Sequence, residues 1–176
     1  MGKLIFITGG SRSGKSTLAV TLAQSMRKSK IFIATCIPED SEMRRRVALH
    51  KKNRPFSWRT IEAKDNLTSV LKKESKSDIV IIIDCLTLFI SSLLMRKARE
   101  RKIKDETGKV VRIIKDGRAT VIIVSNEVGA GLVPENKLCR DFRDIVGTCN
   151  QMVAGSADEV IYMVSGIPLK IKGAGQ

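Results

Sequence analysis

A glycine-rich turn near the N-terminus constrains this chain more than any other feature. Residues 4–17 read LIFITGGSRSGKST, and Gly9, Gly14, Lys15 and Ser16 follow the G-x-x-x-x-G-K-S spacing of a phosphate-binding loop. The glycines let backbone N–H groups point inward around an anion, and a helix N-terminus adds partial positive charge. In such a loop Lys15 is expected to reach the β- and γ-phosphates, and the Ser16 hydroxyl is expected to hold Mg²⁺.

The residues on both sides of this turn suit a phosphate loop. Leu4 to Thr8 is a short β-prone run, and Leu18, Leu22 and Met26 recur afterwards at helical spacing, which predicts a helix from Lys15 to about residue 27. A ligand-free glycine and serine turn is the alternative interpretation. The motif and its strand–loop–helix context together favour a nucleoside triphosphate site over that alternative.

Further apolar runs predict a mostly parallel sheet. Ile31 to Ala34 would form a strand after the first helix, giving a β-α-β unit and a parallel pair with the first strand. Residues 78–84 (DIVIIID) and 119–124 (ATVIIV) have no polar face, as expected of strands buried inside a parallel sheet. Asp84 at the exit of its strand matches the carboxylate that holds the Mg²⁺ shell beside Ser16 in P-loop enzymes.

The rest of the chain reads as helices and a closing hairpin. The last long helix should bury one apolar side, formed by Leu138, Phe142, Ile145, Val146, Cys149 and Val153. The basic stretch after residue 95 should break at 105–108. The expected helices span 39–52, 66–73, 87–95 and 136 to about 154, and the hairpin joins 159–164 to 169–171 through residues 165–168.

The only histidine of the chain is a candidate nucleophile. Glu42, Arg46 and His50 lie at i, i+4 and i+8 on one face of the helix expected over 39–52. Basic neighbours would lower the imidazole pKa and keep its neutral, nucleophilic form. A lone histidine is more often structural than catalytic, so this pattern by itself leaves both roles open.

The loop after residue 124 is a second candidate for contact with the phosphates. If the strand over 119–124 lies beside the first strand, Asn126 and Glu127 would face the γ-phosphate as polar sensors or as a proton acceptor. A capped turn with no such role is an equally good interpretation of this glycine-containing segment.

The amino-acid composition indicates which kinds of ligand this chain is expected to bind. The formal net charge of +14 favours anions, with a nucleotide pocket ranked first, a solvated basic surface second and nucleic acid third, because aromatic residues for base stacking are scarce. We expect a single catalytic domain over residues 1–176, with no signal peptide and no apolar run long enough to cross a bilayer. The four cysteines form no C-x-x-C pair, and this pattern suits a reducing cytoplasm.

Several segments together resemble the bifunctional adenosylcobinamide kinase/adenosylcobinamide-phosphate guanylyltransferases of cobalamin biosynthesis. They occur in order across nearly the whole chain, and the histidine segment with the Asn-Glu-Val-Gly loop is the most specific part. The matching segments are 8–16 (TGGSRSGKS), 33–35 (IAT), 42–43 (EM), 46–50 (RVALH), 54–55 (RP), 58–60 with Glu62, 84–88 (DCLTL), 126–136 (NEVGAGLVPEN), 142–144 (FRD), Asn150, 157–160 (ADEV) and 165–167 (SGI).

The resemblance implies a RecA-like P-loop fold, a homotrimer and two reactions. The first moves a γ-phosphoryl group from ATP or GTP to the aminopropanol hydroxyl of adenosylcobinamide. In the second, GTP guanylylates a histidine, here His50, and the GMP passes to adenosylcobinamide phosphate to give adenosylcobinamide-GDP. The nucleotide-binding positions that the resemblance implies are Thr8, Gly9, Gly10, Ser11, Arg12, Ser13, Gly14, Lys15, Ser16, Ala34, Thr35, Cys36, Lys51, Lys52, Asn53, Arg54, Glu62 and Asp84.

The segment from Met95 to Ala119 departs from the family pattern, because it is short and basic where the family is usually longer and more acidic. This difference concerns local packing and corrinoid or subunit contacts rather than the nucleotide site. Two alternatives stay open: a P-loop kinase or NTPase that acts on another small molecule without a covalent nucleotide, and a nucleic-acid-binding module that uses the nucleotide as a switch.

Overall fold

In the part of the chain that the structure describes, seven strands form one sheet in the order β3-β2-β4-β5-β1-β6-β7. The computed structural model describes residues 1–35, 55, 57–63, 66–76 and 78–173, so the helix expected over 39–52 lies outside the described residues. Neighbouring strands are parallel except for the antiparallel pair β6 and β7, which confirms the predicted mostly parallel sheet with a C-terminal antiparallel strand. The strands are β1 (Lys3–Gly9), β2 (Lys30–Ala34), β3 (Arg59–Glu62), β4 (Val80–Asp84), β5 (Thr120–Val124), β6 (Glu159–Val164) and β7 (Ile167–Lys172).

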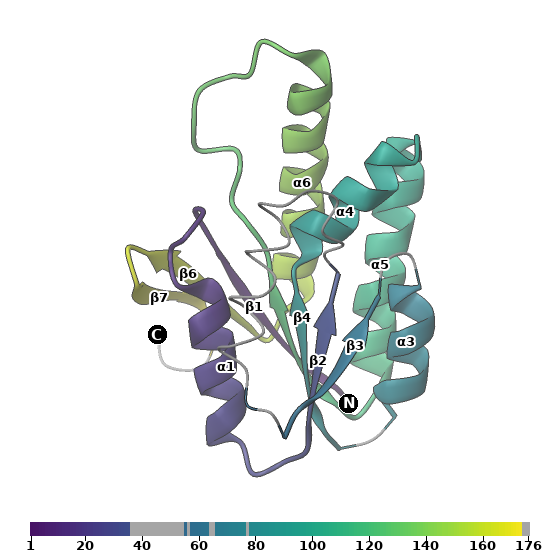
Figure 1. The fold of residues 1–176 in the computed structure, drawn as a ribbon, viewed down its shortest axis with the longest axis vertical. Helices are drawn as coiled ribbons and strands as arrows, with labels where there is room; N and C mark the ends of the chain where they lie inside the picture. The colour runs from purple at the N-terminus through teal and green to yellow at the C-terminus, as the bar shows by residue number, and fades with distance from the viewer. Residues whose placement is uncertain (36–54, 56, 64–65, 77, 174–176) are drawn as a thin grey trace.

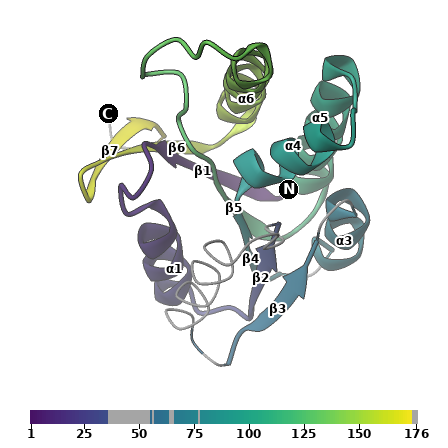
Figure 2. The same ribbon diagram turned by 45° about the horizontal axis from the view of Figure 1, so that its top comes forward.

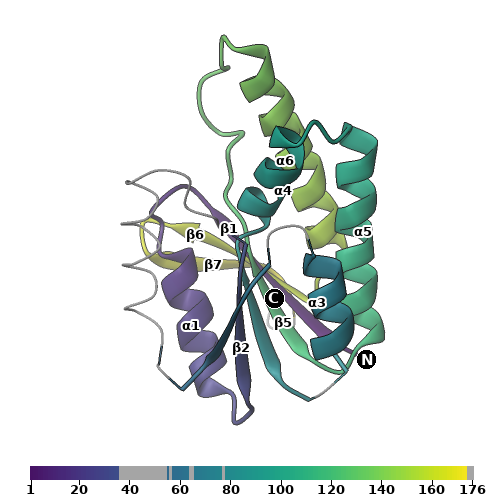
Figure 3. The same cartoon turned by 45° about the vertical axis from the view of Figure 1, so that its right-hand side comes forward.

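Helices cover both faces of this sheet. Among the described residues, helix α1 (Lys15–Ser25) lies on one face, and the other described helices lie on the opposite face (Figures 1 and 3). These helices are α3 (Leu67–Glu74), α4 (Leu86–Met95), α5 (Glu100–Asp116) and α6 (Lys137–Ser156). None of the helices in the described part of the chain is long and apolar enough to span a membrane.

Successive side chains of each strand point to opposite faces of the sheet, so a separate hydrophobic core forms on each face. In β1, Leu4 and Phe6 face α3 to α6, whereas Ile5 and Ile7 face α1. The buried helix residues Ala19 and Ala23 of α1 are small, so this helix can pack closely on the sheet.

The two most uniformly apolar strands, β4 and β5, occupy the middle of the sheet. Their apolar side chains are buried on both faces, so they need neighbours and helices on every side. They therefore lie between β1 and β2, and the predicted direct pairing of β1 with β2 is wrong, although the two strands do run in the same direction.

Helix α5 is continuous through residues 105–108, so the predicted break there is wrong. Ile103, Thr107, Val110 and Ile114 recur at helical spacing and are all fully buried. A glycine inside a helix costs about 1 kcal/mol relative to alanine, and burial of this long apolar face outweighs that cost at Gly108.

Helix α6 begins outside the core. Its N-terminal part projects beyond the sheet in Figures 1 and 2, and Leu138 is 49% exposed, so its predicted place on the buried side is wrong. Phe142 is half-buried, and the buried face of the helix begins at Ile145. The hairpin is confirmed, but its turn consists only of Ser165 and Gly166, whose φ angles of 50° and 89° suit a tight two-residue hairpin turn.

Candidate nucleotide-binding active site

The predicted phosphate loop joins the end of β1 to the start of α1. Arg12 and Gly14 have φ angles of 57° and 93°, and the Ser13 N–H donates to the Gly10 carbonyl oxygen over 3.3 Å. Gly14 is the N-cap of α1, which has neither a side-chain cap nor an acidic residue in its first turn. The first N–H groups of this helix are therefore available to an anion.

The loop is held against the β6–β7 hairpin. The Gly166 N–H donates to the Ser13 carbonyl oxygen over 3.1 Å. At Gly9 an added Cβ atom would lie 2.5 Å from the Met163 carbonyl oxygen of β6, so only glycine fits there. Ser11 and Arg12 are exposed at the tip, whereas Ser13 is buried.

Lys15 lies inside this loop. Its side chain is 6% exposed, and its ammonium group donates to the Gly10 carbonyl oxygen and to Ser13 Oγ, the latter over 3.4 Å. Burial lowers the pKa of Lys15, while Cys85 and Asp84 act in the opposite direction. The lysine thus lies inside the glycine-rich turn and within electrostatic reach of Asp84, and its contact with the β- and γ-phosphates stays a prediction.

A row of predicted site residues lies along the carboxyl ends of the neighbouring strands. The register places Glu62 of β3 beside Ala34 of β2, Ala34 beside Asp84 of β4, and Asp84 beside Val124 of β5. Because β1 is parallel to these strands, the phosphate loop leaves the sheet at the same edge, the usual ligand edge of an open α/β sheet.

Thr35 and Thr8 are both buried at this edge. The Thr35 hydroxyl donates to the Cys85 carbonyl oxygen over 2.7 Å and accepts from the Cys85 N–H over 2.8 Å, so it joins the ends of β2 and β4. The Thr8 hydroxyl has no hydrogen-bond partner among the described residues. A buried polar atom at the start of a phosphate loop leaves hydrogen-bonding capacity for a ligand or a water molecule.

Ser16 and Asp84 offer a hydroxyl and a carboxylate, both of them half-buried. Within the described residues, no group of three or more His, Cys, Asp or Glu side chains could hold a metal by itself. Mg²⁺ keeps several water ligands and is usually held by one or two protein oxygens together with substrate phosphates. The donor set at this edge fits that mode of binding.

The loop after β5 lies beside the phosphate loop, because β5 pairs with β1. The Glu127 N–H donates to the Gly9 carbonyl oxygen over 2.9 Å, and Glu127 Oε1 accepts from the Gly129 N–H over 2.8 Å. Strand β5 lies beside β1, which is the arrangement that contact of Asn126 and Glu127 with the γ-phosphate requires. The carboxylate of Glu127 also caps its own turn.

Three buried polar residues behind this loop were not among the predicted site residues. Thr87, Ser125 and Asn150 form hydrogen bonds with one another or with the Asn126 backbone. Each is a polar residue in an otherwise apolar run or on an apolar helix face, and this was the signal available in the sequence.

Six of the predicted site residues lie outside the described residues, and these are Cys36, His50, Lys51, Lys52, Asn53 and Arg54. Their contribution to the site therefore stays a prediction.

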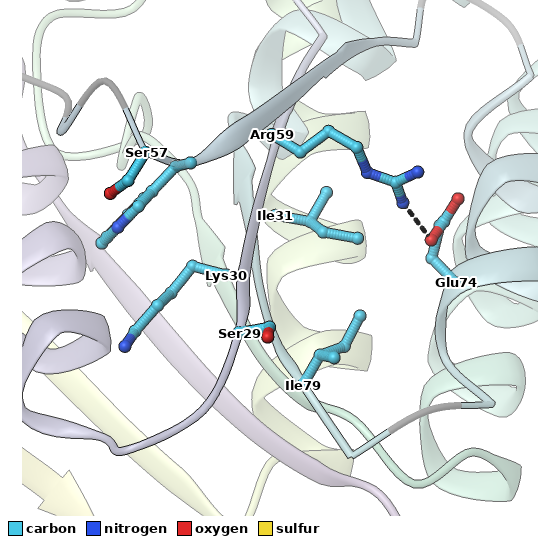
Figure 4. A pocket seen from close by; sticks show the side chains of 8 residues that line it. Ser29, Lys30, Ile31, Ser57, Arg59, Glu74 and Ile79 are labelled. Atoms are coloured by element: carbon cyan, nitrogen blue, oxygen red, sulfur yellow. Dashed lines mark hydrogen bonds and ion pairs between the residues drawn. The ribbon is translucent and has the colours of Figure 1, made fainter.

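A separate hollow of about 510 Å³ lies at the opposite end of the strands (Figure 4). Its lining includes Lys30 and Arg59, the first residues of β2 and β3, and Arg59 forms an ion pair with Glu74. The hollow lies at the amino ends of β2 and β3, whereas the phosphate loop follows the carboxyl end of β1, so the hollow is not part of the candidate nucleotide site.

Comparison with known proteins shows extensive similarity. Residues 5–171 match the family described as cobinamide kinase / cobinamide phosphate guanyltransferase. The bifunctional adenosylcobalamin biosynthesis protein CobU of Salmonella typhimurium is 40% identical over 96% of this chain and 99% of its own length. CobU of Escherichia coli is 36% identical over the same shares, and CobP of Pseudomonas aeruginosa is 36% identical over 95% of this chain and 96% of its own.

Two solved structures share the fold at low sequence identity. An ATPase of a bacterial type III secretion system aligns with a TM-score of 0.63 at 15% identity over 93% of this chain, which spans 52% of that structure. A Pyrococcus horikoshii OT3 protein aligns with a TM-score of 0.59 at 8% identity over 99% of this chain and 88% of its own. The likeness to an ATPase agrees with the P-loop fold predicted from the sequence.

Proposed function

Because this chain belongs to the cobinamide kinase / cobinamide phosphate guanyltransferase family, we propose that it carries out both reactions. It phosphorylates adenosylcobinamide with ATP or GTP, and it then transfers GMP from GTP to adenosylcobinamide phosphate, giving adenosylcobinamide-GDP. The observation that carries this proposal is the buried Lys15 in its glycine cradle, within electrostatic reach of Asp84.

In the kinase step the phosphate loop holds the triphosphate. The free N–H groups at the start of α1 and the Lys15 ammonium bind phosphate oxygens, while Ser16 and Asp84 hold Mg²⁺. Bound there, Mg²⁺ supplies positive charge that offsets the charge developing on the transferred group. The substrate hydroxyl oxygen forms a bond to the γ-phosphorus as the bond from that phosphorus to the β,γ-bridging oxygen breaks, and the hydroxyl proton is released to solvent.

In the second step His50 is the nucleophile. A neutral imidazole nitrogen attacks the α-phosphorus of GTP, and the bond to the leaving pyrophosphate breaks. A phosphate oxygen of adenosylcobinamide phosphate then attacks the same phosphorus, and the P–N bond breaks to release His50. The resemblance supports His50 in this role, and Lys51, Lys52, Asn53 and Arg54 follow it as a basic segment suited to phosphates.

We infer the remaining nucleotide contacts from their position. Glu62, Ala34 and Thr35 lie on the ligand edge beside Asp84. Cys36 directly follows Thr35 in the chain. The rest of the phosphate loop contributes Thr8, Gly9, Gly10, Ser11, Arg12, Ser13 and Gly14.

We further infer a single cytoplasmic catalytic domain that assembles as a homotrimer. Exposed apolar side chains support assembly, because Leu132 and Val133 before α6 and Ile167 of β7 are 96%, 68% and 71% exposed. Sedimentation analysis tests this proposal, and a monomer at micromolar concentration would refute it.

The proposed chemistry predicts a covalent nucleotide. Incubation with Mg²⁺ and GTP labelled at the α-phosphate should give an acid-labile, base-stable adduct on the protein. The variant His50→Ala should lose this adduct and still phosphorylate adenosylcobinamide. A folded His50→Ala protein that labels normally would exclude His50 as the nucleophile.

Lys15→Ala tests whether both reactions use the same triphosphate site. It should lose both activities, because removal of one preorganised donor lowers kcat by about 10²–10³-fold. A P-loop kinase acting on another small molecule would instead show nucleotide turnover, no covalent adduct and no phosphorylated corrinoid.

A further inference from the structure

Three buried polar side chains meet behind the loop that follows β5. Thr87 comes from the first turn of α4, Ser125 directly follows β5, and Asn150 lies on the buried face of α6. They are 3%, 0% and 6% exposed. The Thr87 and Ser125 hydroxyls are 3.0 Å apart, and Ser125 Oγ is 2.7 Å from Asn150 Oδ1.

The proton of each hydroxyl can be assigned. Ser125 has one hydroxyl proton and donates it to Asn150 Oδ1, so in the 3.0 Å contact Thr87 must be the donor. Thr87 Oγ1 in turn accepts from the Asn126 N–H over 2.7 Å. Asn150 Nδ2 donates to the Asn126 carbonyl oxygen over 3.1 Å, which closes a ring of four hydrogen bonds.

This ring holds a short piece of backbone next to the phosphate loop. Both backbone polar groups of Asn126 are bound by buried side chains, one on α4 and one on α6. The next N–H, that of Glu127, donates to the Gly9 carbonyl oxygen over 2.9 Å. Residues 126 and 127 are therefore tied to α4, α6 and the phosphate loop at once.

Stability alone does not require such a ring. Replacing a complete set of buried hydrogen-bonding partners by apolar groups of the same shape can be nearly neutral. A fully satisfied polar network does, however, favour one backbone arrangement over its neighbours. Here the arrangement that it selects directs the Glu127 N–H toward the Gly9 carbonyl oxygen of the phosphate loop.

We propose that Thr87, Ser125 and Asn150 are positioning residues for phosphoryl transfer, acting by fixing Asn126 and Glu127 against the phosphate loop. This inference rests on the proposed function, in which that loop holds the triphosphate. It assigns no contact with the substrate to the three residues themselves. Their effect should appear in the rate of the chemical step and should leave nucleotide binding nearly unchanged.

The test compares Thr87→Val with a matched control. Valine keeps the shape of threonine and removes the hydroxyl. The control Thr107→Val removes another fully buried hydroxyl, on α5, which bonds to the Ile103 carbonyl oxygen and to Cys149 Sγ. Thr87→Ser keeps the hydroxyl and should restore function.

For Thr87→Val we expect kcat of adenosylcobinamide phosphorylation to fall by about 10–100-fold, since misplacement by 1 Å can lower a rate by about 10²-fold. The KM for the nucleotide should change by less than about threefold, because the phosphate loop itself is intact. Thr87→Ser and Thr107→Val should both keep kcat within about threefold of the unmodified protein. Amide hydrogen exchange at Asn126 should accelerate in Thr87→Val alone.

Ser125→Ala, which removes the central hydroxyl without adding an atom, carries the same expectations if Thr87→Val does not fold. An equal kcat for Thr87→Val and Thr107→Val, a change confined to KM, or no recovery in Thr87→Ser would overturn the inference. The Lys15→Ala variant distinguishes failure of this inference from failure of the proposed triphosphate site. If Lys15→Ala still binds and turns over nucleotide normally, the triphosphate site itself is wrong.

Discussion

Replacement of Gly9 by alanine is the sharpest test of how the phosphate loop is built. Gly9 has a φ angle of 146°, which residues with a Cβ atom rarely adopt. The added Cβ would lie 2.5 Å from the Met163 carbonyl oxygen and 3.1 Å from both the Met163 nitrogen and Ser13 Oγ. The nearest of these atoms belong to the backbone of β6, which is paired with β1 on one side and β7 on the other and cannot easily move.

The expected loss of stability in Gly9→Ala has two causes, the strained backbone conformation and the steric overlap with β6. A non-glycine residue held in such a backbone conformation costs about 1–3 kcal/mol. Overpacking against a fixed neighbour adds about 1–3 kcal/mol. The free energy of unfolding should therefore fall by about 2 kcal/mol or more, which for a chain of this size lowers Tm by at least about 4 °C.

Urea unfolding followed by circular dichroism measures this loss, and Gly10→Ala is the matched control. A Cβ atom on Gly10 would meet no heavy atom within 4 Å, so stability should change by no more than about 0.5 kcal/mol. Gly9→Ala should also weaken nucleotide binding, because the added Cβ atom overlaps Met163 and Ser13 Oγ and so displaces the phosphate loop in which Gly9 lies. Equal stability of the two variants would refute the steric reasoning.

Three further predictions concern stability and reactivity. Burial acts to raise the pKa of Asp158, but hydrogen bonds from the Leu4 N–H and Lys115 together hold this pKa below its ordinary value of 3.8. The Asp158 carboxylate therefore stabilises the fold above about pH 4, and this contribution is lost as the pH falls through the lower, folded-state pKa. Asp158→Asn should flatten the dependence of unfolding free energy on pH between about 5 and 3, and an unchanged slope would contradict this. Lys97 directly follows Arg96, the C-cap of α4, with a φ angle of 60°, and its N–H donates to the Leu94 carbonyl oxygen, so Lys97→Gly should stabilise the protein by about 0.5–1 kcal/mol in urea unfolding. In the same measurement Lys102→Gly, inside α5, should destabilise it by about 1 kcal/mol. Cys139 is exposed, whereas Cys149 is buried and its pKa is raised by that burial. Mass spectrometry after brief alkylation of the folded protein should therefore find Cys139 modified and Cys149 intact. Early modification of Cys149 would show that α6 is not packed against the sheet.

Most of the ligand edge was predictable, because it depends on short-range patterns. The spacing of Gly9, Gly14, Lys15 and Ser16 predicted a phosphate loop, and the structure buries Lys15 against the Gly10 carbonyl oxygen of that turn. The carboxylate at the end of an entirely apolar strand identified Asp84, and burial of β4 on both faces confirms the strand. The role of His50 stays a prediction, because its segment lies outside the described residues.

The errors came where distant residues decide local structure. Asp105 and Gly108 suggested a break in the basic segment, yet the buried residues of α5 pack against α3, α4, α6 and β1 and keep the helix continuous. Leu138 continues the apolar stripe of α6, but no described element covers the first turns of this helix, so the side chain is exposed.

The sequence by itself predicted the phosphate-loop motif and the class of fold, since glycine spacing and apolar runs act within a few residues of one another. Only the tertiary structure decided the order of the strands, which separates β1 from β2 and brings β5 beside the phosphate loop. It also assembled the ring of Thr87, Ser125 and Asn150 from three elements far apart in the chain. Hydrogen bonds between such residues depend on how helices pack across the sheet, and local periodicity carries no information about that packing.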